Sequence, residues 1–231
     1  NVLRMNISYN NFDMLEIGYG INLRPLAIMA ENIYGDDPCE FFKPKRLEEN
    51  KFDPIEDSLA AKMNKAIAIC QFKVEGQRIM AHPEYGLDNR LLLDKIDYEK
   101  GTVKLRDGEY PLRDTNFPTI DPNNPYELTP EEKDVLKALE ASFLQSEKLQ
   151  THIRFLYSHG ALYTVVNGNL LYHGCIPLKE NGGFEDCTVN GVTKSGKDYM
   201  DYLDDQVRKA YFAPDEDEET GRSGDVMWYL W

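Results

Sequence analysis

Cysteine is scarce in this sequence, and its spacing excludes two common uses of the residue. The four cysteines, Cys39, Cys70, Cys175 and Cys187, lie far apart and form no C-x-x-C pair. The chain therefore carries neither a zinc knuckle nor a thioredoxin-like redox motif. A secretory signal pattern is also lacking, and 231 residues can bury a core without disulfide staples. We expect reduced thiols and a cytoplasmic protein.

Basic residues are a minority, and long apolar runs are missing. The 26 Lys and Arg stand against 40 Asp and Glu, which gives a formal net charge of -14. This charge repels nucleic-acid backbones and anionic membranes at long range, so neither is expected as a partner. A small phosphorylated substrate is compatible with it, because local basic side chains or a metal reverse the potential inside a cleft. No apolar run approaches the roughly 20 residues of a membrane-spanning helix.

Residues 1–85 have the hydrophobic spacing of helices. The segment 21–34, INLRPLAIMAENIY, places apolar residues close to every third and fourth position, and Gly35 follows it as a stop. Pro25 favours a helix that begins or bends at that point. A second helix is predicted from about Ile55 to Glu75.

Residues 86–128 change in character, to short apolar runs separated by turn signals. Lys100-Gly101 and Asp107-Gly108 predict a small antiparallel excursion. The stretch TNFPTIDPNNPYELTP that follows is typical of a proline-rich surface connection.

Residues 129–231 open on a helix start signal. Thr129 supplies an N-cap, Pro130 suits the first helical position, and Glu132 completes a capping box. The pattern predicts one helix from Pro130 to about Tyr157. It is expected to bury Val135, Leu136, Leu139, Phe143, Leu144, Leu149, Ile153 and Leu156.

The remainder of this region predicts strands and a last helix, so the expected fold class is mixed α/β. Asn167-Gly168 favours a two-residue type I′ hairpin whose second arm ends at His173. Ser195 is expected to cap a helix that ends at Pro214. The acidic run 215–219 is expected to be a solvated loop.

The two ends of the sequence suggest a piece of a longer polypeptide. The chain opens on Asn1 without a methionine and closes on the apolar segment VMWYLW. We expect Trp228 and Trp231 to leave an apolar surface that packs under further sequence or drives association into a homo-oligomer.

Three of the four histidines have ordinary explanations. His82 precedes a proline at a predicted helix end, where it caps the helix or faces solvent. His159 precedes a glycine and suits the helix C-terminus. His152 and Arg154 either line a cleft or lie on a helix surface, and Arg154 could hold a phosphate with two parallel hydrogen bonds.

His173 has a different setting. A histidine at the end of a strand, followed by Gly174, presents its imidazole above the sheet edge. It is either a metal ligand or part of a strand end, because a single histidine does not make a metal site. Cys175 could join such a site, although a small buried thiol is the commoner outcome.

Four strings carry a resemblance to a known family: NGNLLYHGCIPL, RFLYSHGALY, GYGINLRPLA and VMWYLW. Together they resemble class III fructose-1,6-bisphosphatase, a bacterial family built on a calcineurin-like metallophosphoesterase core. The resemblance covers the whole chain. It implies a middle portion that begins after a Gly-Asn-His-Asp metal motif and ends before a late Gly-His motif.

The resemblance implies an activity and one metal ligand. In metallophosphoesterases, the histidine of an HG step at a strand end binds one of two bridged divalent ions, here Mn2+, and His173 matches that step. The remaining ligands have no counterpart in residues 1–231, so the fragment alone is expected to be inactive. The implied reaction converts fructose 1,6-bisphosphate into fructose 6-phosphate and phosphate. Arg154, Lys179 and Arg4 are candidates for binding the substrate phosphates.

A second reading remains open for the fragment. Residues 1–85 and about 86–125 do not belong to a minimal metallophosphoesterase core. They would form a cap over the sugar, a subunit contact or an effector site. The alternative function is therefore a non-catalytic cap, oligomerisation or effector-binding module.

Overall fold

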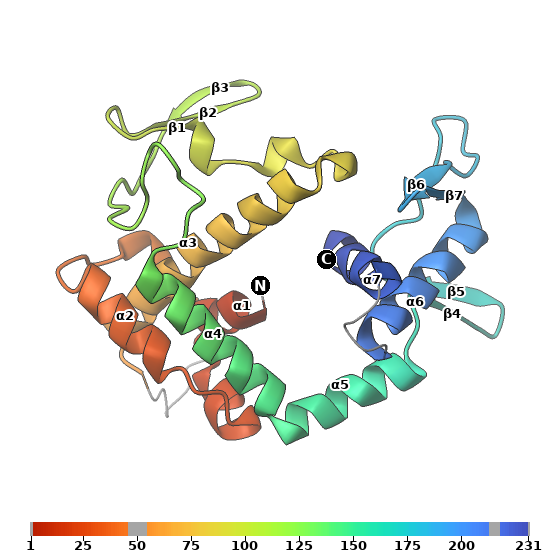
Figure 1. The fold of residues 1–231 in the computed structure, drawn as a ribbon, viewed down its shortest axis with the longest axis horizontal. Coiled ribbons are helices and arrows are strands. Elements are labelled where there is room, and N and C mark those ends of the chain that lie inside the picture. Colours follow the sequence, from red (N-terminus) through yellow and green to blue (C-terminus); the bar gives the residue numbers. More distant parts are fainter. Residues whose placement is uncertain (1, 46–54, 213–217, 231) are drawn as a thin grey trace. The chain divides into compact units, whose positions relative to one another are not determined.

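The computed structural model describes residues 2–45, 55–212 and 218–230, and it divides the chain into two compact units (Figure 1). The first unit covers residues 1–150 and the second covers residues 151–231. Both units combine helices with short strands, which confirms the mixed α/β class. Among the described residues, no helix has the length and apolar character needed to cross a membrane.

The first unit is built around one long helix. Its elements are α1 (Val2–Ser8), a π-helical turn (Met14–Gly18), α2 (Arg24–Tyr34), α3 (Asp57–Ala81), β1 (Ile96–Asp97), β2 (Thr102–Leu105), β3 (Gly108–Pro111) and α4 (Pro130–Gln145). Short 3-10 helices lie at Glu40–Phe42, Pro83–Tyr85, Asp88–Arg90 and Leu93–Lys95. Helices α1 and α2 pack on α3, and α4 packs on α2 (Figure 1).

The predicted helices of this unit are confirmed, with shifted ends. Helix α2 begins at Arg24, because Pro25 in its first turn needs no intrahelical hydrogen bond there. Helix α3 starts near the expected residue but continues to Ala81, six residues beyond Glu75. The antiparallel excursion is also present, as the three-stranded sheet β1-β2-β3.

Helix α3 buries charge as well as apolar surface. Lys65 is fully buried, and its Nζ lies 2.6 Å from Asp37 Oδ2 and 2.7 Å from Asp114 Oδ2. Lys73 is also fully buried and pairs with Glu132 at 2.8 Å. A buried ammonium group is tolerated only when it is paired and hydrogen-bonded. These pairs therefore fix the loops around α3 as well as the start of α4.

The single helix predicted from Pro130 to Tyr157 is wrong. The structure has two helices, α4 (Pro130–Gln145) and α5 (Glu147–His159), separated at Ser146, whose backbone is extended with ψ 97°. The Ser146 hydroxyl donates to the Tyr19 carbonyl at 2.5 Å and accepts from the Leu149 amide at 3.4 Å. This serine caps α5 and is tied to a distant loop, so the helix cannot pass through it.

The burial predicted for this segment is correct only in part. Val135 and Leu139 are buried in the core of the first unit, whereas Leu144 is 66% exposed and Leu156 is 63% exposed. Leu144 lies five residues after Leu139, about 140° further around α4, so it points away from the buried stripe. Leu156 lies beyond the break at Ser146, in the separate helix α5.

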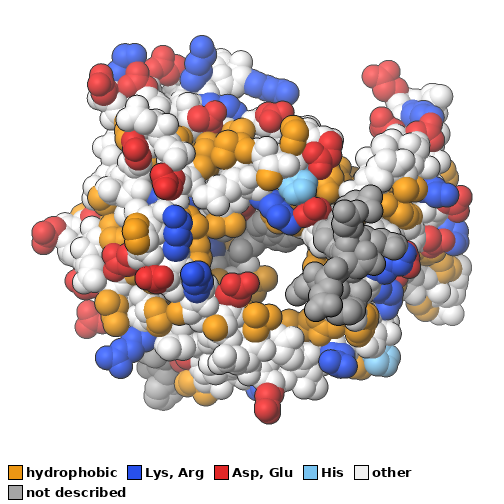
Figure 2. Space-filling model, viewed as in Figure 1, with side chains coloured by type: hydrophobic (Ala, Val, Ile, Leu, Met, Phe, Trp, Pro, Cys, Tyr) orange, Lys and Arg blue, Asp and Glu red, His pale blue; other side chains and the backbone are white. Residues whose placement is uncertain are grey.

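The second unit contains most of α5, two further helices and two hairpins. After α5 come β4 (Tyr163–Val166), β5 (Asn169–Tyr172), β6 (Cys187–Val189), β7 (Val192–Lys194), α6 (Gly196–Phe212) and α7 (Glu218–Leu230). Its core is small and contains Val189, Tyr199, Leu203 and Val226. Figure 2 shows acidic, basic and apolar side chains interspersed over the face in view.

Both hairpins turn through an Asn-Gly pair. Asn167 and Gly168 have φ angles of 52° and 76°, which confirms the predicted type I′ turn between β4 and β5. Asn190 and Gly191 have φ angles of 50° and 74° and connect β6 to β7 in the same way. The second hairpin was not predicted, although Asn190-Gly191 is the same turn signal.

The C-terminal region differs from expectation. Helix α6 follows Ser195 as predicted. The expected acidic loop is wrong at Glu218 and Glu219, which belong to α7, whereas residues 215–217 lie outside the described part of the chain. Val226 is fully buried against α6, so part of the terminal apolar segment is covered within its own unit. Trp228 is half-buried, and Trp231 lies outside the described residues.

Candidate functional site

His173 lies at the end of strand β5, as predicted. The strand stops at Tyr172, and Gly174 takes a φ of 90°, a conformation that favours glycine and turns the chain away from the sheet. The His173 side chain is exposed. The hairpin thus presents an accessible imidazole, which is a suitable nitrogen donor for a divalent transition metal.

The donor set around His173 is incomplete. Among the residues that the structure describes, no group of three or more His, Cys, Asp or Glu could hold a metal ion. Transition-metal sites in proteins use three or four protein ligands. The described residues therefore supply one suitable donor but do not fit a complete metal centre.

The two thiols that follow His173 in the sequence, Cys175 and Cys187, differ in exposure. Cys175 is exposed, so the expectation of a small buried thiol is wrong, because the chain turns outward after Gly174. Cys187 is half-buried. Burial raises the pKa of the Cys187 thiol, and the acidic side chains of Glu185 and Asp186 raise it further. A thiol with a raised pKa is a poor nucleophile and a poor metal ligand at neutral pH.

The three candidate phosphate-binding residues lie in different places. Arg154 is exposed on α5, and Lys179 is exposed and paired with Asp186 at 3.1 Å; both belong to the second unit. Arg4 lies on α1 in the first unit, where its Nε donates to Gln71 Oε1 at 2.9 Å. Their joint role in substrate binding stays a prediction.

Two of the other histidines have the structural roles expected of them. His82 closes α3, donating its backbone N–H to the Ile79 carbonyl, and its ring nitrogen lies 2.9 Å from Glu84 Oε1. The His159 ring lies in the last turn of α5 and is hydrogen-bonded to the Phe155 carbonyl at 3.1 Å. His152 is exposed on the same helix.

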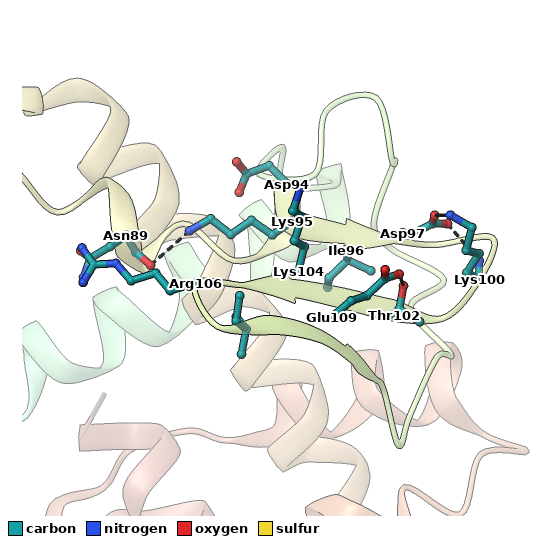
Figure 3. Close-up of a pocket in the computed structure, with 11 residues that line it drawn as sticks. Asn89, Asp94, Lys95, Ile96, Asp97, Lys100, Thr102, Lys104, Arg106 and Glu109 are labelled. Carbon is teal, nitrogen blue, oxygen red and sulfur yellow. Dashed lines mark hydrogen bonds and ion pairs between the residues drawn. The ribbon is translucent and has the colours of Figure 1, made fainter.

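A second candidate site is a cavity of about 880 Å³ beside the three-stranded sheet (Figure 3). Its lining carries four basic side chains, Lys95, Lys100, Lys104 and Arg106, and three acidic ones, Asp94, Asp97 and Glu109. The Lys95 ammonium donates to the Asn89 carbonyl at 3.2 Å, and Lys100 is paired with Asp97 at 2.7 Å. The sequence predicts only the turns here, because the cavity forms when the antiparallel pairing of β1 and β2 brings Lys95 beside Lys104.

Comparisons with known proteins identify the family. A family described as Firmicute fructose-1,6-bisphosphatase matches residues 1–231. Class 3 fructose-1,6-bisphosphatases from Clostridium tetani and Listeria innocua are 52% and 46% identical over all 231 residues. The chain spans 35% of the length of each of these two relatives. No solved structure matches. The resemblance predicted from the sequence is confirmed, and the chain belongs to the Firmicute fructose-1,6-bisphosphatase family.

Proposed function

We propose that residues 1–231 are part of a phosphatase that hydrolyses fructose 1,6-bisphosphate to fructose 6-phosphate and phosphate in gluconeogenesis. The observation that carries the proposal is the family match over the whole chain. The exposed imidazole of His173 at the end of β5 is consistent with it. We further propose a cytoplasmic location, which suits the four free cysteines.

We propose His173 as one ligand of a two-ion Mn2+ centre whose other ligands lie outside residues 1–231. Such ions, when bound, lower the pKa of a water molecule and neutralise phosphoryl charge. The role of this chain would be to hold the imidazole at the end of strand β5. Residues 129–231 would then belong to a calcineurin-like core, and residues 1–85 and 86–128 would form a largely helical insertion or cap.

Arg154 and Lys179 are the proposed contacts for the substrate phosphates in the second unit, and Arg4 is the candidate from the first. Arginine suits this task because its planar guanidinium can bind two phosphate oxygens at once. The ion pair between Lys179 and Asp186 would have to open, or to share its lysine, when a phosphate binds.

The test uses a chimera in which residues 1–231 replace the matching segment of the Clostridium tetani relative. Phosphate release from fructose 1,6-bisphosphate is measured with Mn2+ for the chimera and for the 231-residue chain. We expect turnover by the chimera and none by the chain alone, because one donor cannot hold two ions. A chimera that folds and binds Mn2+ but releases no phosphate would contradict the proposal.

The cavity beside β1-β2-β3 favours a second candidate function, effector binding. Its four basic side chains outnumber the acidic Asp94, Asp97 and Glu109 in the lining, on a chain whose net charge is -14. Such a local reversal of sign suits a small phosphorylated ligand. Isothermal titration of the chimera with inorganic phosphate, before and after Lys104→Gln with Arg106→Gln, tests it. Equal binding by both proteins would exclude this cavity.

A further inference from the structure

The chain folds back on itself in the loop between β5 and β6. Leu178 and Phe184 form an isolated antiparallel bridge in this loop. One residue closer to its turn, the Lys179 amide donates to the Gly183 carbonyl at 2.8 Å. The two arms of the loop are therefore paired residue by residue, as in a short antiparallel hairpin.

The same register continues towards the open end of the loop. One residue beyond the bridge, the Glu185 amide donates to the Pro177 carbonyl at 3.1 Å. Counted onward in this register, Cys175 lies directly opposite Cys187. This is a hydrogen-bonded position of an antiparallel pair, where opposite Cα atoms are about 5.5 Å apart. Disulfides form across Cα separations of about 4.4–6.8 Å, so the register brings the two thiols within reach of each other.

Electrostatic effects within the second unit also place the two thiols together. Burial raises the pKa of the Cys187 thiol, and Glu185, Asp186 and Cys175 raise it further. Burial likewise raises the pKa of Tyr199 to about 12, with smaller contributions that include both thiols. Charges interact appreciably only over short distances. Cys175 and Cys187 are therefore close to each other and to the Tyr199 ring of α6.

The cysteines differ in their access to solvent. Cys39 and Cys70 are buried in the first unit, whereas Cys175 is exposed and Cys187 is half-buried. Exchange with a dissolved disulfide requires an accessible sulfur. Of these thiols, Cys175 is therefore the one that meets such a molecule first, and Cys187 is the one placed to react with it next.

We propose that Cys175 and Cys187 form a reversible oxidation site for a small dissolved disulfide of the glutathione type. This inference goes beyond the proposed phosphatase function and does not depend on it. Disulfides of this kind in reducing compartments are transient and serve redox sensing. A closed bridge would restrain the backbone that follows Gly174, whose φ of 90° turns the chain away from β5.

The reaction has two exchange steps. The Cys175 sulfur attacks the small disulfide, breaks its S–S bond and releases one thiol, which leaves a mixed disulfide on the protein. The Cys187 sulfur then attacks the Cys175 sulfur and releases the second thiol. The two cysteines are oxidised by loss of their thiol hydrogens, and the small disulfide is reduced to two thiols. Cys187 reacts despite its raised pKa because the loop holds it opposite the mixed disulfide.

Peptide mapping of the chimera with the Clostridium tetani relative tests the site without any use of activity. Trypsin cuts after Lys179, which leaves Cys175 in peptide 155–179 and Cys187 in peptide 180–194. In a mixture of reduced and oxidised glutathione, we expect these peptides to be joined and to separate again on reduction. The joined form should exceed the glutathione adduct of Cys175 at least about 10-fold. Absence of the joined form, or a bond from Cys175 to another molecule, would overturn the proposal.

A serine variant separates a paired site from a lone exposed thiol. In Cys187→Ser, we expect the glutathione adduct to accumulate on Cys175 at least about 10-fold above its level in the parent chimera, because the second step is lost. Equal amounts of adduct in the two proteins would show that Cys187 takes no part, and this result would overturn the proposal.

Two alanine variants test whether the register brings the thiols together. Gly182 has a φ of 82° in the turn, which strains any residue with a Cβ atom, whereas the neighbouring Gly183 does not have a positive φ. We expect Gly182→Ala to lower the ratio of joined to reduced peptide roughly 5-fold relative to Gly183→Ala. Equal ratios in the two variants would contradict the pairing on which the proposal rests.

Discussion

Lys73 and Glu132 form an ion pair of 2.8 Å in which the two side chains are 0% and 2% exposed. The same carboxylate also accepts the Thr129 amide at 2.8 Å, which completes the capping box of α4. Lys73 donates as well to the Thr119 carbonyl at 2.6 Å. One glutamate therefore starts α4 and neutralises a charge inside α3.

Glu132→Gln tests the importance of this pair for stability. The substitution leaves the Lys73 ammonium buried without a counter-charge, so we expect a loss of about 3–5 kcal/mol in the free energy of unfolding. Urea unfolding followed by circular dichroism measures it. Glu140→Gln, at an exposed position on the same helix, is the control and should change stability by less than about 0.5 kcal/mol. If Glu132→Gln and Glu140→Gln changed the free energy of unfolding equally, the ion pair between Lys73 and Glu132 would not contribute to stability.

Asp37 predicts an acid-sensitive step. Burial alone would raise the pKa of its carboxyl group, but hydrogen bonds from Lys65, the Cys39 amide and Asn116 outweigh this effect and lower the pKa to about 2. A lowered folded-state pKa contributes stability that is present above the ordinary value of 3.8 and is lost as the pH falls towards 2.

Asp37→Asn should therefore flatten the decline in stability between about pH 4 and pH 2. At neutral pH it should cost roughly 1–3 kcal/mol, because Lys65 loses one of its two carboxylate partners while keeping Asp114. Melting temperature against pH measures both effects. Asp36→Asn, an exposed neighbour, should leave the acid slope unchanged.

At Gly76, close packing and helix propensity predict opposite effects of a substitution by alanine. A Cβ atom at this position in α3 would lie 2.0 Å from Tyr126 Cδ1. Gly76→Ala should therefore destabilise the chain by about 1–3 kcal/mol, although alanine is the better helix former. Gly224→Ala in α7 is the matched control, because a Cβ atom there would meet nothing within 4 Å. This substitution should raise the free energy of unfolding by up to about 1 kcal/mol. If both alanine substitutions stabilised the chain, Tyr126 could not lie as close to Gly76 as described here.

His173→Ala separates a metal ligand from a structural residue. In the chimera we expect activity and Mn2+ content to fall by roughly 100-fold or more, with little change in melting temperature, because the side chain is exposed. Cys175→Ser, also at an exposed position, should change neither quantity much. A His173→Ala chimera with full metal occupancy and a normal rate would end the ligand hypothesis.

Local signals in the sequence predicted local structure well. The capping box at Thr129 and the turn at Asn167-Gly168 depend on backbone and side-chain chemistry within a few residues, and both are present. Contacts across the chain could not be found in this way. The break at Ser146 depends on a hydrogen bond to the Tyr19 carbonyl, 127 residues away. The spacing of apolar residues on its own therefore predicted one continuous helix.

The candidate site was predictable only as far as His173. Its position follows from strand length and the glycine after it, which are local properties. The cavity beside β1-β2-β3 depends on strand pairing that brings Lys95 near Lys104 and Arg106, and single residues gave no sign of it. The pairing of Lys73 with Glu132 also joins residues that are far apart in the sequence, so the local capping signal at Glu132 does not reveal it.

The buried lysines of α3 also have a consequence for synthesis on the ribosome. Lys62 binds Glu31, which is made before it, whereas Lys73 depends on Thr119 and Glu132, which are made after it. Until those partners emerge, the ammonium group of Lys73 must stay hydrated, so this part of α3 cannot be buried in the core of the first unit. We expect nascent chains that end before residue 132 to be protease-sensitive within α3 and longer ones to become resistant, so that translation itself sets the moment at which the first unit folds.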